Sequence, residues 1–205
     1  MNTCNHTLDY YNQNASAFTE STFHTDMHVL QDHFSSLLYR GASILDFGCG
    51  SGRDAKFFLE QGFAVEAVDG SAECVKLARE LTGLDVKQLL FQELDAVESY
   101  DGIWACASIL HLPKGELGAV LQKMAAALKD NGVIYTSFKY GDFEGERNGR
   151  YFTDFTEEAF SQFIEENPKV AAALTIEEMW LTCDARPGRG DEKWLNIIMR
   201  RRSTR

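Results

Sequence analysis

Hydrophobic residues along the chain form short continuous runs separated by stretches with helical spacing. The runs that have the length and the flanking turn residues of buried strands are 44–45, 63–68, 86–90, 103–107 and 133–138. Between most of these runs, apolar side chains recur every three or four positions, as they do in amphipathic helices. The alternation of strand and helix predicts a doubly wound α/β domain with a mostly parallel sheet.

Both ends of the chain depart from this alternation. The first 40 residues contain only helical patterns, the second of which covers 27–38. A polar, glycine-rich stretch over 140–151 predicts a loop, and a helix is expected over 156–166. The runs 176–182 and 193–199 flank a further polar loop, so they pair most easily as an antiparallel hairpin. The sheet is therefore expected to carry an antiparallel strand at or near one edge.

Composition limits the class of protein. With 205 residues, of which 44% are hydrophobic and 25% charged, the chain is expected to form one globular domain that needs no disulfides. No apolar run approaches the roughly 18 residues of a membrane span, and the polar N-terminus lacks the apolar core of a signal peptide. The cysteines are odd in number and show no CxxC spacing, which predicts reduced thiols in a cytoplasmic protein. They are Cys4, Cys49, Cys74, Cys106 and Cys183.

Charge and histidine spacing exclude two further kinds of site. A formal net charge of −11 argues against a broad contact with a phosphate backbone, so no nucleic-acid partner is expected. His24 and His28 stand four positions apart and would share a helix face as a metal-binding pair does. No acidic or cysteine residue stands at a convincing ligand spacing from them. We therefore expect solvated histidines and no metal.

The most specific stretch is a glycine-rich turn between the first strand and the helix after it. Asp46 is followed by glycines at 48, 50 and 52, which allow positive φ and close approach of a ligand to the backbone. Asp69 ends the next strand roughly 20 residues further on, where an acid accepts hydrogen bonds from ribose hydroxyls. A dinucleotide fingerprint would place its third glycine at 53, and that residue is Arg53. The pattern thus indicates an adenosine ligand other than NAD or FAD.

These segments resemble the signature motifs of the class I S-adenosylmethionine-dependent methyltransferases. Ile44–Gly52 resembles motif I of that family, Val68–Ser71 its second-strand acid, and Tyr100–Trp104 its fourth strand. The resemblance covers about residues 40–140 and implies a Rossmann-like, mostly parallel seven-stranded sheet with an antiparallel C-terminal hairpin strand. Among subfamilies, the chain is similar to small stand-alone bacterial enzymes of the tellurite-resistance-related type.

The resemblance also implies a division of the chain and a cofactor. A single methyltransferase domain would span 1–205, with a helical leader or lid at 1–40 and a cofactor-binding core at 41–140. The substrate-side loop, helix and hairpin would then occupy 141–205. The implied cofactor is S-adenosyl-L-methionine.

A set of cofactor-binding residues at the carboxyl ends of the strands follows from the same resemblance. They are Asp46, Gly48, Cys49, Gly50 and Gly52 beside the methionine moiety, Asp69 at the ribose hydroxyls, Gly70, Ser71, Phe91 and Gln92 around the adenine, and Ala107 and Ser108 beneath the sulfonium. Arg53 is expected to pair with the cofactor carboxylate, the alternative being a solvated side chain in the first helical turn.

Methyl transfer needs alignment and exclusion of water more than it needs strong acid–base groups. Tyr11 or its neighbour Tyr10 in the leader is a candidate for a cation–π contact with the sulfonium, with core packing as the alternative. His111 follows the fourth strand and is a candidate base for an OH or NH acceptor, the alternative being a structural or cofactor-contact role. Candidates for a substrate wall, unless they are simply solvated, are Asp142, Glu144, Arg147 and Arg150 and the charged residues of the loop 184–189.

The sequence therefore predicts an S-adenosylmethionine-dependent methyltransferase that acts on an unidentified small-molecule acceptor. One alternative is a catalytically idle S-adenosylmethionine-binding module, which would keep the cofactor motifs and lose an open acceptor pocket. A nicotinamide-dependent dehydrogenase is disfavoured because the third fingerprint glycine is absent. No membrane partner is expected, and the sequence does not indicate an oligomeric state.

Overall fold

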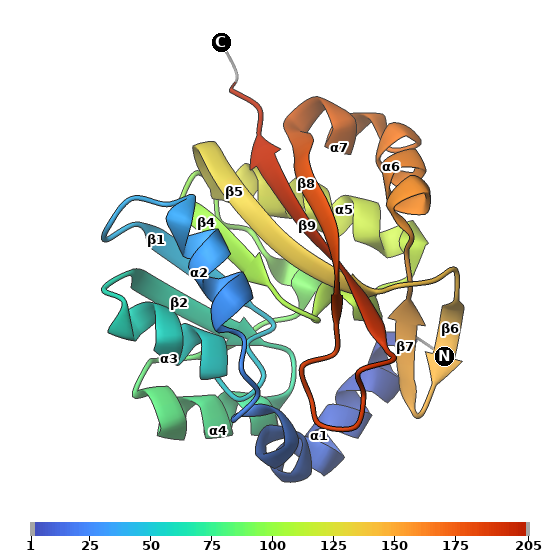
Figure 1. The fold of residues 1–205 in the computed structure, drawn as a ribbon. Coiled ribbons are helices and arrows are strands. Elements are labelled where there is room, and N and C mark those ends of the chain that lie inside the picture. The colour runs from blue at the N-terminus through green and yellow to red at the C-terminus, as the bar shows by residue number, and fades with distance from the viewer. Residues whose placement is uncertain (1–2, 204–205) are drawn as a thin grey trace.

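A seven-stranded sheet in the order β3-β2-β1-β4-β5-β9-β8 runs through the centre of the molecule (Figure 1). The computed structural model describes residues 3–203, and side chains from residue 6 onward. The strands of this sheet are β1 (Ser43–Phe47), β2 (Ala64–Asp69), β3 (Lys87–Gln88), β4 (Tyr100–Ala105), β5 (Leu128–Lys139), β8 (Leu174–Cys183) and β9 (Lys193–Arg201). The helices are α1 (Thr3–Thr22), α2 (His28–Ser36), α3 (Arg53–Glu60), α4 (Ala72–Thr82), α5 (Lys114–Ala127), α6 (Glu157–Glu165) and α7 (Pro168–Ala173), with 3-10 turns η1 (Phe91–Glu93) and η2 (Ile109–His111).

Strand pairing confirms the predicted fold class. The pairs β1–β2, β1–β4, β2–β3 and β4–β5 are parallel, whereas β5–β9 and β8–β9 are antiparallel. The strand β8 therefore forms an antiparallel edge, as the hairpin pattern predicts. The strand order reverses between β1 and β4, and parallel sheets of this kind bind ligands at the carboxyl ends of the strands beside such a reversal.

Alternation along the strands divides the core into two layers, one on each face of the sheet. Ile103 of β4 belongs to the cluster that also contains Met124 of α5. The next residue, Trp104, points to the opposite face and packs against Phe34 of α2 and Phe58 of α3. Helices α2 and α3 therefore cover one face, and α5 covers the other.

A second sheet occupies the stretch 140–151, where the sequence predicts a loop. The strands β6 (Glu144–Arg147) and β7 (Arg150–Thr153) pair as an antiparallel hairpin beside α1 (Figure 1). Asn148 and Gly149 form its turn with φ values of 54° and 75°. Positive φ at both central residues is the geometry that an Asn-Gly pair favours in two-residue hairpins. The loop prediction is wrong because this dipeptide outweighs the polar composition around it.

Three further boundaries differ from the sequence-based expectation. The helix α5 stops at Ala127 and β5 follows without a turn, so this strand begins at Leu128, ahead of the apolar run 133–138. The third strand is reduced to Lys87–Gln88. The short helix α7 was not predicted, although Pro168 occupies its first turn, where the missing N–H costs nothing.

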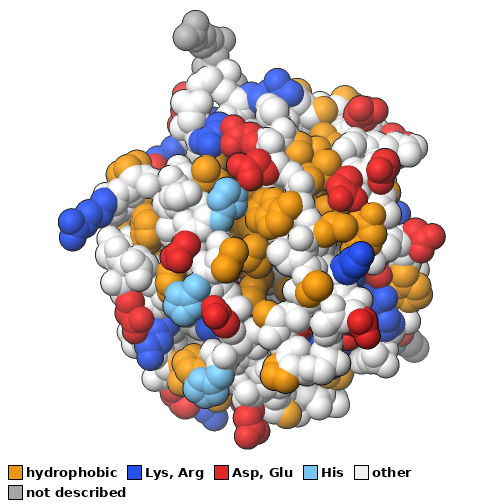
Figure 2. All heavy atoms as spheres, viewed as in Figure 1, with side chains coloured by type: hydrophobic (Ala, Val, Ile, Leu, Met, Phe, Trp, Pro, Cys, Tyr) orange, Lys and Arg blue, Asp and Glu red, His pale blue; other side chains and the backbone are white. Residues whose placement is uncertain are grey.

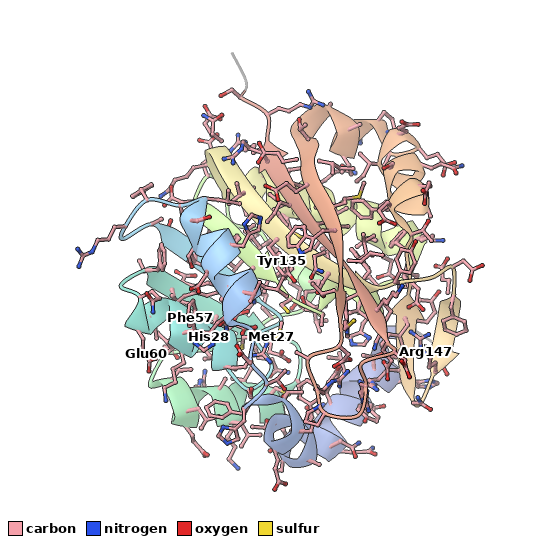
Figure 3. The ribbon with its side chains drawn as sticks, in the orientation of Figure 1. Met27, His28, Phe57, Glu60, Tyr135 and Arg147 are labelled. Carbon is pink, nitrogen blue, oxygen red and sulfur yellow. The ribbon has the colours of Figure 1, made fainter. Side chains whose placement is uncertain are left out.

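His24 and His28 do not share a helix face, although their spacing would allow it. The helix α1 ends at Thr22 and α2 begins at His28, so His24 lies in the connection between two helices. His28 instead contacts Asp26 through Nδ1 at 2.9 Å and packs on the ring of Phe57 (Figure 3). Among the described residues, no group of three or more His, Cys, Asp or Glu is placed to hold a metal ion.

The sequence also predicts reduced thiols and no membrane-spanning segment. The thiols of Cys49, Cys74, Cys106 and Cys183 are free, while the Cys4 side chain lies outside the described part of the chain. None of the helices described between residues 3 and 203 combines the length and apolar character needed to span a membrane.

The buried carboxylate of Asp54 connects α2, α3 and β4 next to the glycine-rich turn that follows β1. Asp54 accepts hydrogen bonds from Arg53 Nε and Nη2, both at 2.8 Å. It also accepts from Trp104 Nε1 at 2.9 Å and from Gln31 Nε2 at 2.7 Å. Burial raises the pKa of Asp54, but the Arg53 charge and these donors outweigh burial and hold the pKa below its ordinary value. Helices α2 and α3 are thereby tied to β4.

We expect Asp54→Ala to lower the free energy of unfolding by about 3–5 kcal/mol, the cost of removing one partner of a buried ion pair. The loss arises because Arg53 and the Trp104 indole keep their donors in a buried site with no acceptor. Urea unfolding measures it. As a control, Asp32→Ala on the exposed side of α2 should change stability by less than about 0.5 kcal/mol. A loss below about 1 kcal/mol in Asp54→Ala would contradict this account.

Candidate functional site

A cavity of about 480 Å³ opens at the carboxyl ends of β1 and β4. Hydrophobic side chains gather around a hollow near the middle of this face (Figure 2). The walls come from α1, the glycine turn, the segment after β4, the β6–β7 hairpin and the loop between β8 and β9. A volume of this size is typical of small-molecule sites, which combine apolar walls with a few placed polar groups.

The glycine turn after β1 forms one wall. Gly48 adopts φ of +86°, and a Cβ there would lie 2.5 Å from the Cβ of Ser108, so only glycine allows β1 and β4 to end this close together. Gly50 adopts φ of +54°, and a Cβ there would lie 3.3 Å from the ring of Phe18 in α1. Gly52 has a packing role, because its Cβ would meet Thr82 of α4 at 2.7 Å.

Asp69 at the end of β2 closes the turn. Its Oδ2 accepts from Gly50 N at 2.9 Å and its Oδ1 from Ser71 N at 2.8 Å. Each carboxylate oxygen retains a second lone pair that can accept from a ligand hydroxyl. Burial raises the pKa of Asp69, and the two N–H donors act in the opposite direction. Ser71 itself accepts from Cys74 N as the N-cap of α4 and donates to Asn12 in α1.

Asp46 and Arg53 lie on the same side of the cavity. Asp46 is buried, and its Oδ2 has no hydrogen-bond partner within the described residues. Burial, reinforced by the charge of Asp54, raises the pKa of Asp46 well above its ordinary value. Arg53 is not a solvated side chain, because it pairs with Asp54 and also donates to the carbonyl of Thr22 at 3.1 Å.

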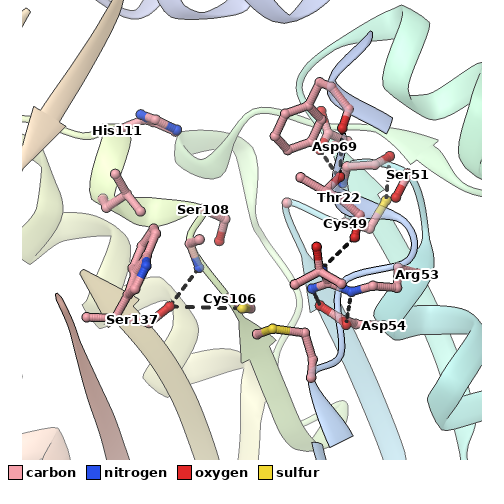
Figure 4. Close-up of a pocket in the computed structure, with 18 of the residues that line it drawn as sticks. Thr22, Cys49, Ser51, Arg53, Asp54, Asp69, Cys106, Ser108, His111 and Ser137 are labelled. Carbon is pink, nitrogen blue, oxygen red and sulfur yellow. Dashed lines mark hydrogen bonds and ion pairs between the residues drawn. The ribbon is translucent and has the colours of Figure 1, made fainter. Parts of the chain in front are cut away.

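The segment after β4 forms the facing wall, with Ser108, Ser137 and His111 across the open space from Asp69 and Arg53 (Figure 4). Ala107 adopts φ of 49°, which is unusual for a residue with a Cβ. Its N–H donates to Ser137 Oγ at 2.9 Å, and Ser108 Oγ donates to the carbonyl of Phe47 at 2.7 Å. These bonds hold the strained backbone at the point where β4 meets the glycine turn.

Phe91 and Gln92 lie on η1, at the side of the cavity next to β2 and α5. The Phe91 ring packs edge-on against Phe47 with centroids 4.8 Å apart. The Gln92 amide donates to Glu116 of α5 at 2.6 Å. Both residues line the cavity.

Tyr11 and His111 form a hydrogen-bonded pair on the wall opposite the glycine turn. His111 Nδ1 is 2.6 Å from the carbonyl of Tyr151, so Nδ1 carries the proton and Nε2 is an acceptor. The Tyr11 hydroxyl, 2.9 Å from Nε2, therefore donates to it. Burial, together with the positive charges of Arg150 and Arg147, lowers the pKa of His111 to about 4. Burial raises the pKa of Tyr11. Both groups are thus neutral near pH 7.

Most of the residues predicted to form the site share this one cavity. Those that line it are Tyr11, Gly48, Cys49, Gly50, Arg53, Asp69, Gly70, Phe91, Gln92, Ala107, Ser108 and His111. Asp46, Gly52 and Ser71 lie behind its surface. Of the four charged candidates in 142–150, Arg150 lines the cavity, whereas Arg147 is held outside it by Asp154. The loop 184–189 contributes Asp184, Arg186 and Arg189.

The sequence analysis missed Phe18 and Ser137. Phe18 lies seven positions after Tyr11, and this spacing places both rings on one face of α1, with centroids 5.1 Å apart. The helical period therefore contained the signal for Phe18. Ser137 lies within the fifth apolar run, where an isolated hydroxyl has no distinguishing pattern.

Comparison with known proteins was made at three levels. A sequence model of the methyltransferase domain family matches residues 44–132. Ubiquinone biosynthesis O-methyltransferase from Xanthomonas oryzae pv. oryzae is 30% identical over 118 residues, which cover 53% of this chain and 48% of that protein. The chain thus spans about half the length of the curated relatives it matches.

Two solved structures extend the likeness to almost the whole chain. The 1,6-didemethyltoxoflavin-N1-methyltransferase of Burkholderia thailandensis, with bound 1,6-didemethyltoxoflavin and S-adenosylhomocysteine, has a TM-score of 0.74 and 25% identity over 96% of this chain and 85% of that chain. A TehB-like methyltransferase from Corynebacterium glutamicum has the same fold, with a TM-score of 0.65 and 18% identity over 95% of this chain and 98% of that chain. The domain match, the relatives and the fold together support a class I S-adenosylmethionine-dependent methyltransferase.

Proposed function

We propose that this protein transfers a methyl group from S-adenosyl-L-methionine to a small-molecule acceptor. The observation that carries the proposal is the single cavity in which the glycine turn and Asp69 face the Tyr11–His111 pair. Similar proteins are named as an O-methyltransferase of ubiquinone biosynthesis and as a 1,6-didemethyltoxoflavin-N1-methyltransferase. In this proposal, 1–40 form a lid, 41–140 bind the cofactor, and 141–205 contribute to the acceptor side of one domain.

The charges around the glycine turn fit a cationic cofactor. Asp46, Asp54 and Asp69 surround the turn, and Arg53 is committed to Asp54. Burial and Asp54 disfavour the charged form of the unpartnered Asp46 carboxyl, and a bound ammonium or sulfonium group would stabilise that form. A pyrophosphate would be repelled at the same place. This electrostatic argument supports S-adenosylmethionine over a dinucleotide.

The residues that would hold the cofactor each have a distinct task. Asp69 would accept hydrogen bonds from the ribose hydroxyls through its free lone pairs. The backbone at Gly48 and Gly50 leaves room for the methionine moiety because neither residue has a Cβ. The Phe91 ring lies where it can contact the adenine.

The bound cofactor supplies a methyl group activated for transfer by its positive sulfur. Aromatic and aliphatic side chains on the acceptor side, including Leu110 and Phe152, exclude water from the reaction. Tyr11 donates to His111, and the Tyr151 carbonyl fixes the imidazole tautomer, so the tyrosine oxygen is held in one position. That oxygen can accept a hydrogen bond from an acceptor O–H or N–H and align it.

The open acceptor side supports an enzyme over an idle binding module. The cavity continues past the glycine turn to Arg150, Lys139 and Asp184, which lie on separate elements. A module that only binds the cofactor gains nothing from such a space. The direct test is transfer of label from S-adenosylmethionine to a panel of small phenols, amines, thiols and carboxylates. Absence of turnover across the panel would favour the idle module.

Asp69→Ala is expected to weaken binding of S-adenosylhomocysteine by about 1–3 kcal/mol, because two hydrogen bonds to a charged group are lost. Isothermal titration calorimetry measures the change. Glu73→Ala, an exposed acid in the first turn of α4, is the control and should bind as the wild type does. Equal affinity in Asp69→Ala, or tighter binding of NAD than of S-adenosylhomocysteine by the wild type, would remove the basis for the cofactor assignment.

The His111 imidazole is expected to remain neutral until the pH falls to about 4, whereas an unfolded histidine titrates near 6.5. Between these values the unfolded chain binds a proton that the native protein does not, so the free energy of unfolding falls as pH decreases through this window. Ring chemical shifts from NMR report the titration. Tyr11→Phe should leave the ring neutral, since burial is the main cause. Protonation of His111 near pH 6.5 in the native protein would contradict the assigned geometry.

A further inference from the structure

Arg150 differs from the other arginines that line the cavity. Arg53 pairs with Asp54, Arg186 pairs with Asp184, and Arg189 lies 3.8 Å from Glu192. Within the described residues, Arg150 forms no ion pair, and its Nε is buried without a hydrogen-bond partner. Arg150 as a whole is half-buried, and a guanidinium partly shielded from water without a counter-charge is stabilised when an anion binds to it.

Aromatic rings hold the Arg150 guanidinium in place. It lies 4.5 Å from the ring centroid of Tyr10, 5.1 Å from that of Phe152 and 5.8 Å from that of Tyr11. Its Nη1 is 3.5 Å from the Tyr11 hydroxyl. Cation–π contacts of this kind orient the group but supply no acceptor for its N–H donors. Nη1 thus donates one hydrogen bond to Tyr11, and the other Nη donors remain available to a ligand in the cavity.

The backbone also fixes this residue. Arg150 is the first residue of β7 and follows directly on the Asn148–Gly149 turn. A Cβ at Gly149 would lie 3.3 Å from the Tyr10 ring, so the turn packs closely against α1. Strand pairing places Arg150 opposite Arg147, whose own charge is neutralised by Asp154.

The two ends of the cavity consequently differ in charge. Asp69 makes the end at the glycine turn negative, because Arg53 there is neutralised by Asp54. Arg150 makes the wall around Tyr11 and His111 positive, and its charge adds to burial, the main cause, in lowering the pKa of His111. An acidic group placed on this wall is favoured in its ionised form.

We infer that the methyl acceptor is a small acidic molecule, whose anionic oxygen is bound by the Arg150 guanidinium beside the Tyr11 hydroxyl. This inference rests on the proposed function and adds the substrate class to it. Arg150 is then a substrate-binding residue that selects carboxylates, phenolates or enolates over neutral molecules of the same shape. The planar guanidinium suits such oxygens because it can donate two parallel hydrogen bonds.

The test compares small aromatic carboxylates with their primary amides, such as benzoate with benzamide and 4-hydroxybenzoate with 4-hydroxybenzamide. Binding is measured by NMR titration on protein saturated with S-adenosylhomocysteine. We expect at least one acid to bind the wild type about 10-fold or more tightly than its amide, the scale of a charge-assisted hydrogen bond. Arg150→Gln should remove this preference, and Arg150→Lys should keep part of it.

Arg40→Gln removes the same charge from an exposed position and serves as the control, with the preference for acids retained. The affinity of each variant for S-adenosylhomocysteine shows whether the fold and the cofactor site are intact. If every acid and its amide bind the wild type alike, or if Arg150→Gln keeps the preference, the acidic acceptor is ruled out and the proposed function stands. Failure of the wild type to bind S-adenosylhomocysteine would instead overturn the proposed function itself.

Discussion

The site depends on the hydrogen bonds of one buried carboxylate, that of Asp54. It gathers the Arg53 guanidinium, the Trp104 indole and the Gln31 amide, which belong to α3, β4 and α2. Arg53 is the first residue after the glycine turn, so this network also sets where the turn ends and α3 begins. The backbone of the glycine turn is therefore stabilised by the Asp54 hydrogen bonds and by the close packing of Gly48 on Ser108.

Negative and positive side chains lie at opposite ends of the cavity. The carboxylates cluster at the turn, where the strands end, while the guanidinium of Arg150 is brought in by the β6–β7 hairpin. The Tyr11–His111 pair lies on the Arg150 side and is neutral near pH 7, so it aligns groups without adding charge. Such an arrangement favours a cationic donor at one end and an anionic acceptor at the other, and attraction between the two would bring them together.

Local patterns in the sequence predicted the strand–helix alternation, the antiparallel edge and the glycine turn, because each depends on neighbouring residues. The Asn148–Gly149 hairpin was also encoded locally, but the polar residues around it obscured the signal. The Tyr11–His111 bond could not be predicted, since it joins residues 100 positions apart. The same holds for Arg53, whose position in the sequence suggested a free side chain or a cofactor contact. Only the tertiary structure shows its pairing with Asp54.

Tyr151 links two parts of the molecule through its backbone alone. Its N–H donates to Thr7 Oγ1 in α1 at 3.0 Å, and its carbonyl accepts from His111. Helix α1 therefore contacts the β6–β7 hairpin through Thr7 and the His111 imidazole through Tyr11, one helical turn later. The hairpin and the imidazole are themselves hydrogen-bonded to each other. Separation of α1 from the cavity would break both contacts, whereas the bond between His111 Nδ1 and the Tyr151 carbonyl would remain. The hairpin alone therefore keeps the imidazole tautomer, and α1 determines only whether Nε2 has its Tyr11 partner.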